Sequence, residues 1–254
     1  MFIDSASNKL IKNTKKLLTR SGRKESGKFI IEGRRLVYDA LENGAAVDYI
    51  LFEQGTEQFD SNGVPVYELS HKAYSALKST VNSQGVMAVV NIPDEGELTL
   101  AETDKCLYIY LDGVSDPGNM GTIIRTADAC GVNGVILSEN CVDVYNPKVV
   151  RSTMASIFNV PIYFDDSKRT VLKKMNECKI NIISGSLQGD NSIYDVDFKS
   201  RCAIVVGNEA NGITDEVIDL STMLVKIPII GKAESLNAAV ACAVMAYESL
   251  RQNL

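Results

Sequence analysis

The chain has 254 residues, of which 45% are hydrophobic and 23% are charged. This composition is typical of a globular protein with one or two domains and argues against a disordered chain. The N-terminus lacks the basic start and apolar run of a signal peptide, and no apolar stretch approaches the roughly 18 residues of a membrane helix. We therefore expect a cytoplasmic protein without a membrane partner.

The net charge of −6 hides an asymmetry along the chain. Residues 1–36 hold ten Lys and Arg against three acids, a net charge of +7, whereas the remainder holds 16 against 29, a net charge of −13. A basic arm on an acidic body suits binding to a phosphate backbone, because Lys and Arg displace condensed counterions. A solvated basic helix explains the same charges, so charge alone leaves both interpretations open.

The cysteines and the histidine argue against metal chemistry. Six cysteines occur without a C-x-x-C pair, most of them inside apolar patterns, which favours reduced, buried thiols over disulfides or zinc. His71 is the only histidine and has no cysteine nearby, which disfavours a metal site or a catalytic triad. We expect no metal, and any catalysis has to use Arg, Glu, Asn, Ser or the backbone.

The first part of the chain alternates helices and strands, which indicates a small α/β domain. The predicted elements are a helix over 7–20, a basic turn over 21–27, a strand and turn over 28–33, a helix over 34–43, strands over 47–52 and 65–69, a short helix over 70–79 and a strand over 85–91. A polar stretch with Pro93 and five acids follows. We place a first domain at 1–95, a linker at 96–104 and a second domain at 105–254.

The second domain has continuous apolar strands with helices between them. The strands are predicted over 106–111, 134–137, 160–164, 180–184, 202–207 and 224–228, and the helices over 122–130, 146–156, 168–178, 214–219 and 235–251. Continuous apolar runs are typical of strands that are buried on both faces of a parallel sheet. The sequence therefore predicts a doubly wound α/β domain.

Three polar motifs begin where predicted strands of the second domain end. They comprise Asn119, Gly121 and Arg125; then Gly207, Glu209 and Gly212; and last Ile227 and Pro228 with Ser235, Leu236 and Asn237. In open α/β sheets, ligands bind beyond the carboxyl ends of the strands. We therefore expect the three motifs to converge on one site.

The motifs resemble those of the SpoU (TrmH-like) RNA methyltransferases of the SPOUT superfamily, which read N-x-G-x-x-x-R, G-x-E-x-x-G and I-P-x with S-L-N. Residues 28–41 are similar to the ribosomal-protein-like substrate-binding domain that precedes the catalytic domain in one branch of that family, although an ordinary strand-helix unit explains them as well. The resemblance implies that the second domain is a parallel-sheet α/β knot, a trefoil that breaks the usual rule against threaded chains.

The resemblance also implies a cofactor and a catalytic residue. S-adenosylmethionine would be bound by Gly207, Ile227 and Leu236, and Gly212 and Pro228 suit the same ligand through their backbone. Arg125 is the implied catalytic residue. Because arginine stays protonated, we expect it to stabilise the charge that develops on a ribose 2′-oxygen. An ion pair with Asp128, three residues on, is the alternative for Arg125.

Four further residues complete the expected catalytic site. Glu209 is expected to orient Arg125, and Asn119 to hold the ribose or the guanidinium. Ser235 and Asn237 open the last predicted helix, where free N–H groups favour an anion. Helix capping is the alternative role for these two residues.

RNA and a second copy of the chain are the expected partners. Arg34, Arg35, Lys148 and Arg151 are the candidate RNA contacts. The last helix carries apolar residues on a continuous face, and the resemblance implies a homodimer through the second domain; a core helix in a monomer is the alternative.

The preferred hypothesis is an RNA ribose 2′-O-methyltransferase that uses S-adenosylmethionine, with ribosomal RNA favoured as substrate and transfer RNA second. A non-catalytic RNA-binding or ribosome-assembly factor is the hypothesis from a different class. A dehydrogenase is disfavoured, because no G-x-G-x-x-G follows the first strand of either domain.

Overall fold

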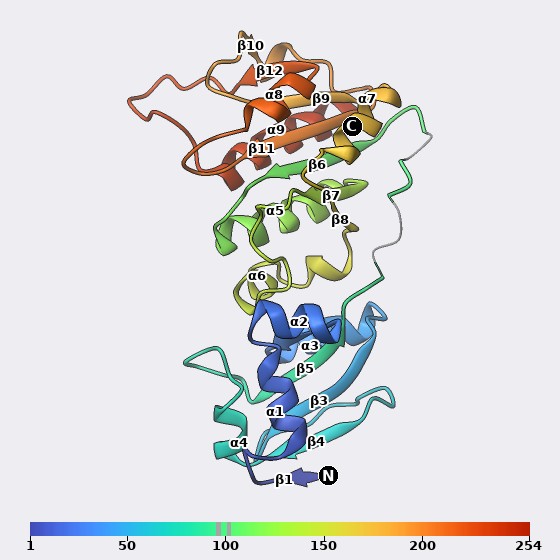
Figure 1. The fold of residues 1–254 in the computed structure, drawn as a ribbon, viewed down its shortest axis with the longest axis vertical. Coiled ribbons are helices and arrows are strands. Elements are labelled where there is room, and N and C mark those ends of the chain that lie inside the picture. The colour runs from blue at the N-terminus through green and yellow to red at the C-terminus, as the bar shows by residue number, and fades with distance from the viewer. Residues whose placement is uncertain (95–97, 101–102) are drawn as a thin grey trace. The chain divides into compact units, whose positions relative to one another are not determined.

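The computed structural model describes residues 1–94, 98–100 and 103–254. The chain divides into two compact units, drawn in Figure 1. Unit 1 comprises Met1–Asp94 and Asp143–Phe158, and unit 2 comprises Glu95–Val142 and Asn159–Leu254. The predicted linker 96–104 includes residues 96, 97, 101 and 102, which lie outside the described residues.

Unit 1 is built on a mixed five-stranded sheet with the order β1-β4-β3-β5-β2. Its strands are β1 (Phe2–Ile3), β2 (Lys28–Glu32), β3 (Val47–Glu53), β4 (Val66–Leu69) and β5 (Val86–Asn91). Its helices are α1 (Lys9–Lys16), α2 (Arg20–Ser26), α3 (Arg34–Glu42), α4 (His71–Ser75), α6 (Pro147–Ser152) and the short 3₁₀ helix η1 (Ser156–Phe158). β5 runs antiparallel to both neighbours, β2 and β3, and the predicted α/β layer is confirmed.

The predicted basic turn over 21–27 is wrong, because the segment forms the helix α2. Thr19 caps this helix by accepting a hydrogen bond from the backbone N–H of Gly22, and Gly27 ends it with a φ of 63°. This is the usual division of labour between a hydroxyl N-cap and a left-handed glycine C-cap. Three of the basic residues of the arm therefore lie on a helix.

The stretch Asp143–Phe158, which the sequence places in the second domain, packs with unit 1. The helix α6 lies against β2, and the ring of Tyr145 lies 4.9 Å from that of Phe29. The buried guanidinium of Arg23 donates a 2.9 Å hydrogen bond to Asp143. An ion pair and a ring contact across more than a hundred residues leave no signal in local periodicity, which explains the different boundary.

Unit 2 is built on a seven-stranded sheet with the order β10-β12-β9-β11-β6-β7-β8, in which every pairing is parallel. Its strands are β6 (Leu107–Asp112), β7 (Gly134–Leu137), β8 (Ile162–Phe164), β9 (Asn181–Gly185), β10 (Asn191–Ser192), β11 (Cys202–Gly207) and β12 (Met223–Lys226). Its helices are α5 (Pro117–Cys130), α7 (Thr170–Glu177), the 3₁₀ helix η2 (Ile193–Asp195), α8 (Asp215–Leu220) and α9 (Ala238–Asn253).

The centre of this sheet is its core. All six residues of β11 are buried, as are five of the six in β6, which confirms the prediction from their continuous apolar runs. Four of the six cysteines are buried and all six are free thiols; burial raises the pKa of Cys242 to about 12. The parallel α/β fold is thus confirmed, and the trefoil knot stays a prediction.

Helix lengths and hydropathy also bear on membranes. No helix within the described part of the chain combines the length and the apolar character needed to cross a lipid bilayer.

Candidate functional site

The central strands of unit 2 bring two of the motifs together. β11 lies between β6 and β9, and Gly207 at its end is aligned with Asp112 at the end of β6. The loop that leads from β6 into α5 and the loop that follows β11 are therefore neighbours. The third motif follows β12 and leads into α9, which packs against α5 and β11. These strand pairings and helix contacts bring the three motifs together at the carboxyl ends of the strands, as expected.

The carboxylate of Glu209 joins the first two motifs. It accepts hydrogen bonds from the side-chain amide of Asn119 (2.9 Å), from the hydroxyl of Ser115 (2.9 Å) and from the backbone N–H groups of Ser115 (3.2 Å) and Asp116 (3.1 Å). Desolvation would raise the pKa of Glu209, but the bond from Asn119 and the backbone bonds outweigh it and hold the pKa at about 2. Glu209 is therefore charged at neutral pH and anchors the loop that opens α5.

Asn119 extends this chain of hydrogen bonds to the third motif. Its side-chain oxygen accepts a 2.9 Å bond from the side-chain amide of Asn237. Asn237 in turn caps α9, since its side-chain oxygen accepts from the N–H groups of Ala239 and Val240. Glu209, Asn119 and Asn237 therefore connect all three motif loops through side chains alone.

The predicted start of the last helix at Ser235 is wrong. The helix begins at Ala238 with Asn237 as its N-cap, because an asparagine side chain satisfies the first free N–H groups as well as a serine does. Ser235 is exposed and precedes the cap. The capping alternative is thus correct for Asn237, and Ser235 instead lines a cavity.

Arg125 lies on α5 with an exposed side chain. It makes no hydrogen bond or ion pair with any described residue, and Asp128 accepts its bond from Asn159. The alternative pair of Arg125 with Asp128 does not form. The expected contact between Glu209 and Arg125 does not form either, because the carboxylate is already committed to Asn119, Ser115 and Asp116.

A cavity of about 470 Å³ opens beside these loops. Four of the five predicted cofactor-binding residues line it: Gly207, Gly212, Ile227 and Leu236. Pro228 is exposed and does not line the cavity. Sequence reasoning missed the end of β9 and the loop after it, from Gly185 to Gln188, which also line the cavity. The position of this loop could have indicated it, because it too follows the carboxyl end of a buried strand.

The two glycines of the second motif shape the wall of this cavity. Gly207 has no room for a side chain, because a Cβ atom there would lie 2.2 Å from the carbonyl carbon of Gly212. The loop between them closes through paired backbone hydrogen bonds of 2.9 Å between Asn208 and Gly212, and Gly212 adopts a φ of 72°. The close approach at Gly207 and the left-handed backbone at Gly212 each favour glycine, which has no Cβ atom.

A buried ion pair that was not predicted from the sequence stabilises the end of β6 and the segment after the second motif. Arg169, 6% exposed, donates a 3.1 Å hydrogen bond to Asp112, which is 2% exposed. The other oxygen of Asp112 accepts from the N–H (2.8 Å) and hydroxyl (2.7 Å) of Thr214, which follows the second motif. Arg169 itself caps α7 with a φ of 55°. This network ties the end of β6 to the residue that opens α8.

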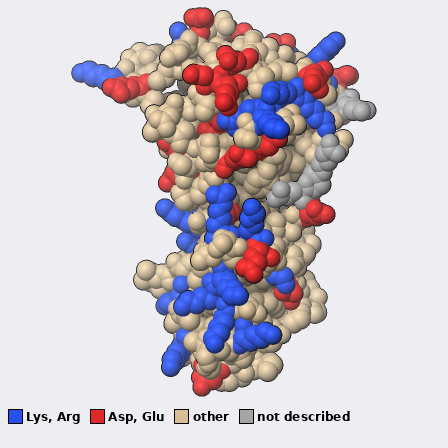
Figure 2. Space-filling model, in the orientation of Figure 1, with Lys and Arg blue, Asp and Glu red and all other residues tan. Residues whose placement is uncertain are grey.

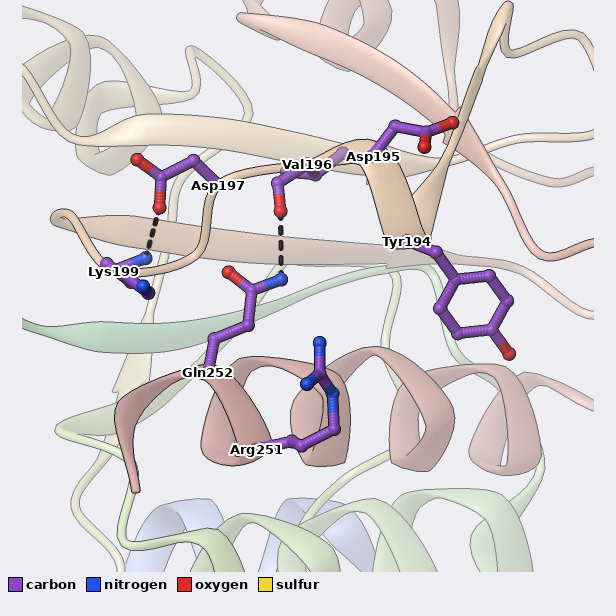
Figure 3. Close-up of a pocket in the computed structure, with 7 residues that line it drawn as sticks. All are labelled: Tyr194, Asp195, Val196, Asp197, Lys199, Arg251 and Gln252. Atoms are coloured by element: carbon purple, nitrogen blue, oxygen red, sulfur yellow. Dashed lines mark hydrogen bonds between the residues drawn. The ribbon is translucent and has the colours of Figure 1, made fainter.

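A second hollow in unit 2, of about 570 Å³, contains none of the predicted site residues. Figure 3 shows it between α9 and the loop that follows η2, with Gln252 donating to the carbonyl of Val196. Its lining mixes two acids, Asp195 and Asp197, with two bases, Lys199 and Arg251. Within the described part of the chain, no group of three or more His, Cys, Asp and Glu could hold a metal ion.

The four candidate RNA contacts all lie in unit 1. Figure 2 shows Lys and Arg gathered over this unit on the face drawn. Arg34 stacks over Phe59 at 5.3 Å and donates to the carbonyl of Glu57, whereas the side chain of Arg35 is 82% exposed. Lys148 is exposed, and Arg151 donates a 2.6 Å bond to Ser79.

Two family models match the chain. The SpoU rRNA Methylase family matches residues 106–247, and the MRM3-like substrate binding domain matches residues 8–88. The 23S rRNA (guanosine(2553)-2'-O)-methyltransferase RlmP of Bacillus subtilis (strain 168) is 35% identical over 250 residues, covering 96% of this chain and 97% of the relative. The 23S rRNA (uridine(2479)-2'-O)-methyltransferase of Streptomyces viridochromogenes is 30% identical, covering 92% and 86%.

Solved structures agree with these relatives. The AdoMet-bound rRNA methyltransferase from Sinorhizobium meliloti is similar with a TM-score of 0.89 and 30% identity, covering 100% of this chain and 98% of that one. The SpoU methyltransferase AviRb from Streptomyces viridochromogenes, in complex with the cofactor AdoMet, gives a TM-score of 0.87 and 29% identity, covering 97% and 98%. With its three motifs joined by hydrogen bonds, and two of them lining one cavity, the chain belongs to the SpoU rRNA methylase family.

Proposed function

We propose that this protein is an S-adenosylmethionine-dependent methyltransferase that modifies a ribose 2′-hydroxyl of structured RNA, with ribosomal RNA as its substrate. The observation that carries the proposal is the pair of side-chain hydrogen bonds that link Glu209, Asn119 and Asn237. These bonds join the first motif to the two motif loops that line the cavity. The relatives named as 23S rRNA 2'-O-methyltransferases support ribosomal RNA over transfer RNA. Action on ribosomal RNA fits the expected place in the cytoplasm.

The cavity fits S-adenosylmethionine in size and chemistry. Its volume of about 470 Å³ falls in the range of small-molecule sites, ~300–1,000 Å³. Gly207 and Gly212 leave backbone groups accessible to a flat ring edge, and Ile227 and Leu236 provide apolar walls. The cofactor supplies an electrophilic sulfonium methyl group when it is bound. Pro228, outside the lining, is the residue of the predicted set with the least support.

Arg125 is the residue proposed to act on the reacting oxygen. Its guanidinium carries a fixed positive charge with all its donors uncommitted among the described residues, which suits stabilisation of the negative charge that develops on the 2′-oxygen. Glu209 is a positioning residue, because a carboxylate with a pKa of about 2 is a poor proton acceptor at neutral pH. Asn119 and Asn237 position the loops, and the exposed hydroxyl of Ser235 lies on the cavity wall to contact a ligand.

The division of labour follows the two family models. We propose that residues 1–95 form the RNA-binding domain and residues 105–254 the catalytic domain, with Arg34, Arg35, Lys148 and Arg151 as RNA contacts. The segment with Lys148 and Arg151 then serves RNA binding from within unit 1.

A homodimer through the catalytic domain is part of the proposal. Val240 and Tyr247 are 49% and 52% exposed, and at a spacing of seven residues they share one side of α9. The opposite side of α9, with Cys242 and Met245, is buried within unit 2. An exposed apolar stripe on a helix whose other side is already packed suits an isologous contact with a second copy.

The test is transfer of tritium from methyl-labelled S-adenosylmethionine to total RNA from the host, followed by digestion to nucleosides. Wild type is expected to label a 2′-O-methylnucleoside, and Arg125→Ala to lose the label while keeping its fold. Fractionation into ribosomal and transfer RNA identifies the substrate. Tight RNA binding by wild type without any transfer would favour the non-catalytic RNA-binding factor instead.

A further inference from the structure

Unit 1 contains a second polar cavity, of about 280 Å³, outside the methyltransferase motifs. It lies at the end of β2 and the first turns of α3, and is closed by the loop 79–84 and by residues that end α6. Its lining includes two of the predicted RNA contacts, Arg35 and Arg151, with Asn82 and Gln84 between the same elements. The two arginines are more than a hundred residues apart in the sequence, so only the fold brings them together.

The floor of the cavity is a hydrogen-bonded carboxylate. Glu32 is 8% exposed and accepts bonds from the N–H (2.9 Å) and hydroxyl (2.6 Å) of Ser79 and from the hydroxyl of Thr80 (2.5 Å). Burial would raise the pKa of Glu32, but these bonds outweigh it and lower the pKa. The carboxylate therefore fixes the start of the loop 79–84, and the hydrogen bonds from Ser79 and Thr80 stabilise its charge.

The rim of the cavity keeps unused polar groups. Arg151 donates one N–H to the hydroxyl of Ser79 at 2.6 Å, which leaves the rest of its donor fork uncommitted among the described residues. Gln84 accepts a bond from the N–H of Arg34 through its oxygen, so its NH₂ group remains. Asn82 is exposed and uses neither end of its amide within the described chain. The side chain of Arg35 is 82% exposed and contacts Asp39 at 3.5 Å.

The backbone beside the cavity holds two non-glycine residues in costly conformations. The consecutive residues Met154 and Ala155 have φ values of 50° and 75°. Left-handed conformations at non-glycine residues cost about 1–3 kcal/mol each and gather at ligand sites. Met154 is 54% exposed and lines the cavity beside the buried side chain of Leu36, which gives the cavity an apolar wall.

We propose that this cavity binds one unstacked nucleotide of the RNA substrate, its base edge on the amides of Asn82 and Gln84 and its phosphate on Arg35 and Arg151. The inference rests on the proposed function, which supplies the RNA. The volume of about 280 Å³ suits a single base and not a whole cofactor. Splayed bases that stack on apolar or guanidinium groups and bond through their edges are the usual targets of sequence-dependent RNA recognition.

The arrangement separates this site from general electrostatic attraction. Other basic residues of unit 1, such as Arg20 on α2, are exposed but line no part of the cavity. If the surface recognised only phosphate groups, Arg20 and Arg35 would contribute equally to RNA affinity. The amides of Asn82 and Gln84 can also bond to the edge of an unpaired base. In a duplex the bases are paired and stacked, so their edges cannot enter the cavity.

The test measures binding of the full chain to a fluorescein-labelled single-stranded RNA of 20 random nucleotides, by fluorescence anisotropy, against the same RNA annealed to its complement. Asn82→Ala is compared with Asn13→Ala, an exposed asparagine of α1, and Arg35→Gln with Arg20→Gln. Asn82 has no intramolecular hydrogen bond among the described residues, so its loss leaves the fold intact. We expect Asn82→Ala and Arg35→Gln to weaken single-strand binding about tenfold, and each control less than about threefold.

A second readout locates the nucleotide directly. The same RNA with 4-thiouridine, irradiated in complex with wild type, is expected to cross-link to a peptide that contains residues 79–84 or 151–154. Equal affinities of each variant and its control, cross-links confined to other peptides, or no binding to the single strand would overturn the inference. If wild type transfers tritium but the pocket variants bind RNA as their controls do, the nucleotide site is rejected and the methyltransferase proposal stands. If the pocket peptides cross-link but wild type transfers no tritium, the nucleotide site stands and the methyltransferase proposal is rejected.

Discussion

The side-chain amide of Asn119 bonds to Glu209 at 2.9 Å, and its oxygen accepts from Asn237 at 2.9 Å. One side chain therefore joins the loop after β11 to the N-terminus of α9. Each end of the amide has a partner of the matching kind, so neither aspartate nor leucine could replace it. The arrangement explains why an asparagine stands at the start of the helix that carries Arg125.

We expect Asn119→Ala to slow methyl transfer about 100-fold, because misplacement of a site by about 1 Å has this effect. Two exposed hydrogen bonds are lost at about 1 kcal/mol each, so the protein still folds. Thr122→Ala on the same helix removes only a bond to the carbonyl of Gly118 and serves as the control. Single-turnover rates with saturating cofactor measure the effect, and equal rates for the two variants would contradict it.

The pKa of Glu209 gives a second prediction, about acid stability. The folded pKa of about 2 lies below the ordinary value of about 4.3. The stabilisation by this carboxylate is therefore fully present above about pH 4.5 and is lost as the pH falls toward 2. We expect the urea midpoint of Glu209→Gln to lie below that of wild type by a constant amount between pH 5 and 8, and the difference to shrink at lower pH.

Glu139→Gln is the matched control for this titration, because Glu139 is exposed and makes no hydrogen bond with the described residues. Its midpoint is expected to follow that of wild type at every pH. A Glu209→Gln difference that grew on acidification would show that the carboxylate is not held in its charged form.

Much of unit 2 was predictable because its signals are local. Continuous apolar runs predicted β6 and β11, and their shared carboxyl edge predicted that Gly207 and Asn119 would serve one site. The contacts of Glu209 were not predictable. The sequence offered Arg125 as the natural partner of a carboxylate, whereas two backbone N–H groups and two polar side chains take that place in the fold.

Two of the missed contacts share a cause, which is distance along the chain. Arg169 pairs with Asp112 across 57 residues, and Arg23 with Asp143 across 120. Neither arginine lies in a motif, and periodicity reports only neighbours within a few turns. The helix α2 was missed for another reason: its composition is that of a turn, and only the caps at Thr19 and Gly27 reveal it.

The close approach of Gly207 to Gly212 predicts that no other residue is tolerated there. Gly207→Ala places a methyl group 2.2 Å from a backbone carbon, and overpacking of this kind costs about 1–3 kcal/mol. We expect the loop to shift and the cofactor affinity to fall more than tenfold by calorimetry. Gly231→Ala is the control, since a Cβ atom at Gly231 meets nothing within 4 Å; equal affinities in the two variants would refute the steric argument.

The buried pair of Arg169 and Asp112 predicts a large loss of stability. Arg169→Met leaves an uncompensated carboxylate in the interior, which costs about 3–5 kcal/mol. The exposed Lys173→Met on the same helix removes the same charge and is expected to change the free energy of unfolding by less than about 0.5 kcal/mol. Urea unfolding measures both. A small effect of Arg169→Met would mean that the hydrogen bonds from Thr214 suffice to hold Asp112.

The exposed stripe on α9 predicts the oligomeric state. Val240 and Tyr247 are 49% and 52% exposed on α9, and Val240→Glu would place two like charges close together in an isologous interface. We expect sedimentation velocity to show a dimer for wild type and a monomer for Val240→Glu, with unchanged far-UV circular dichroism. Val81→Glu, in unit 1 and 91% exposed, is expected to stay dimeric. A monomeric wild type would contradict the contact between two copies through this side of α9.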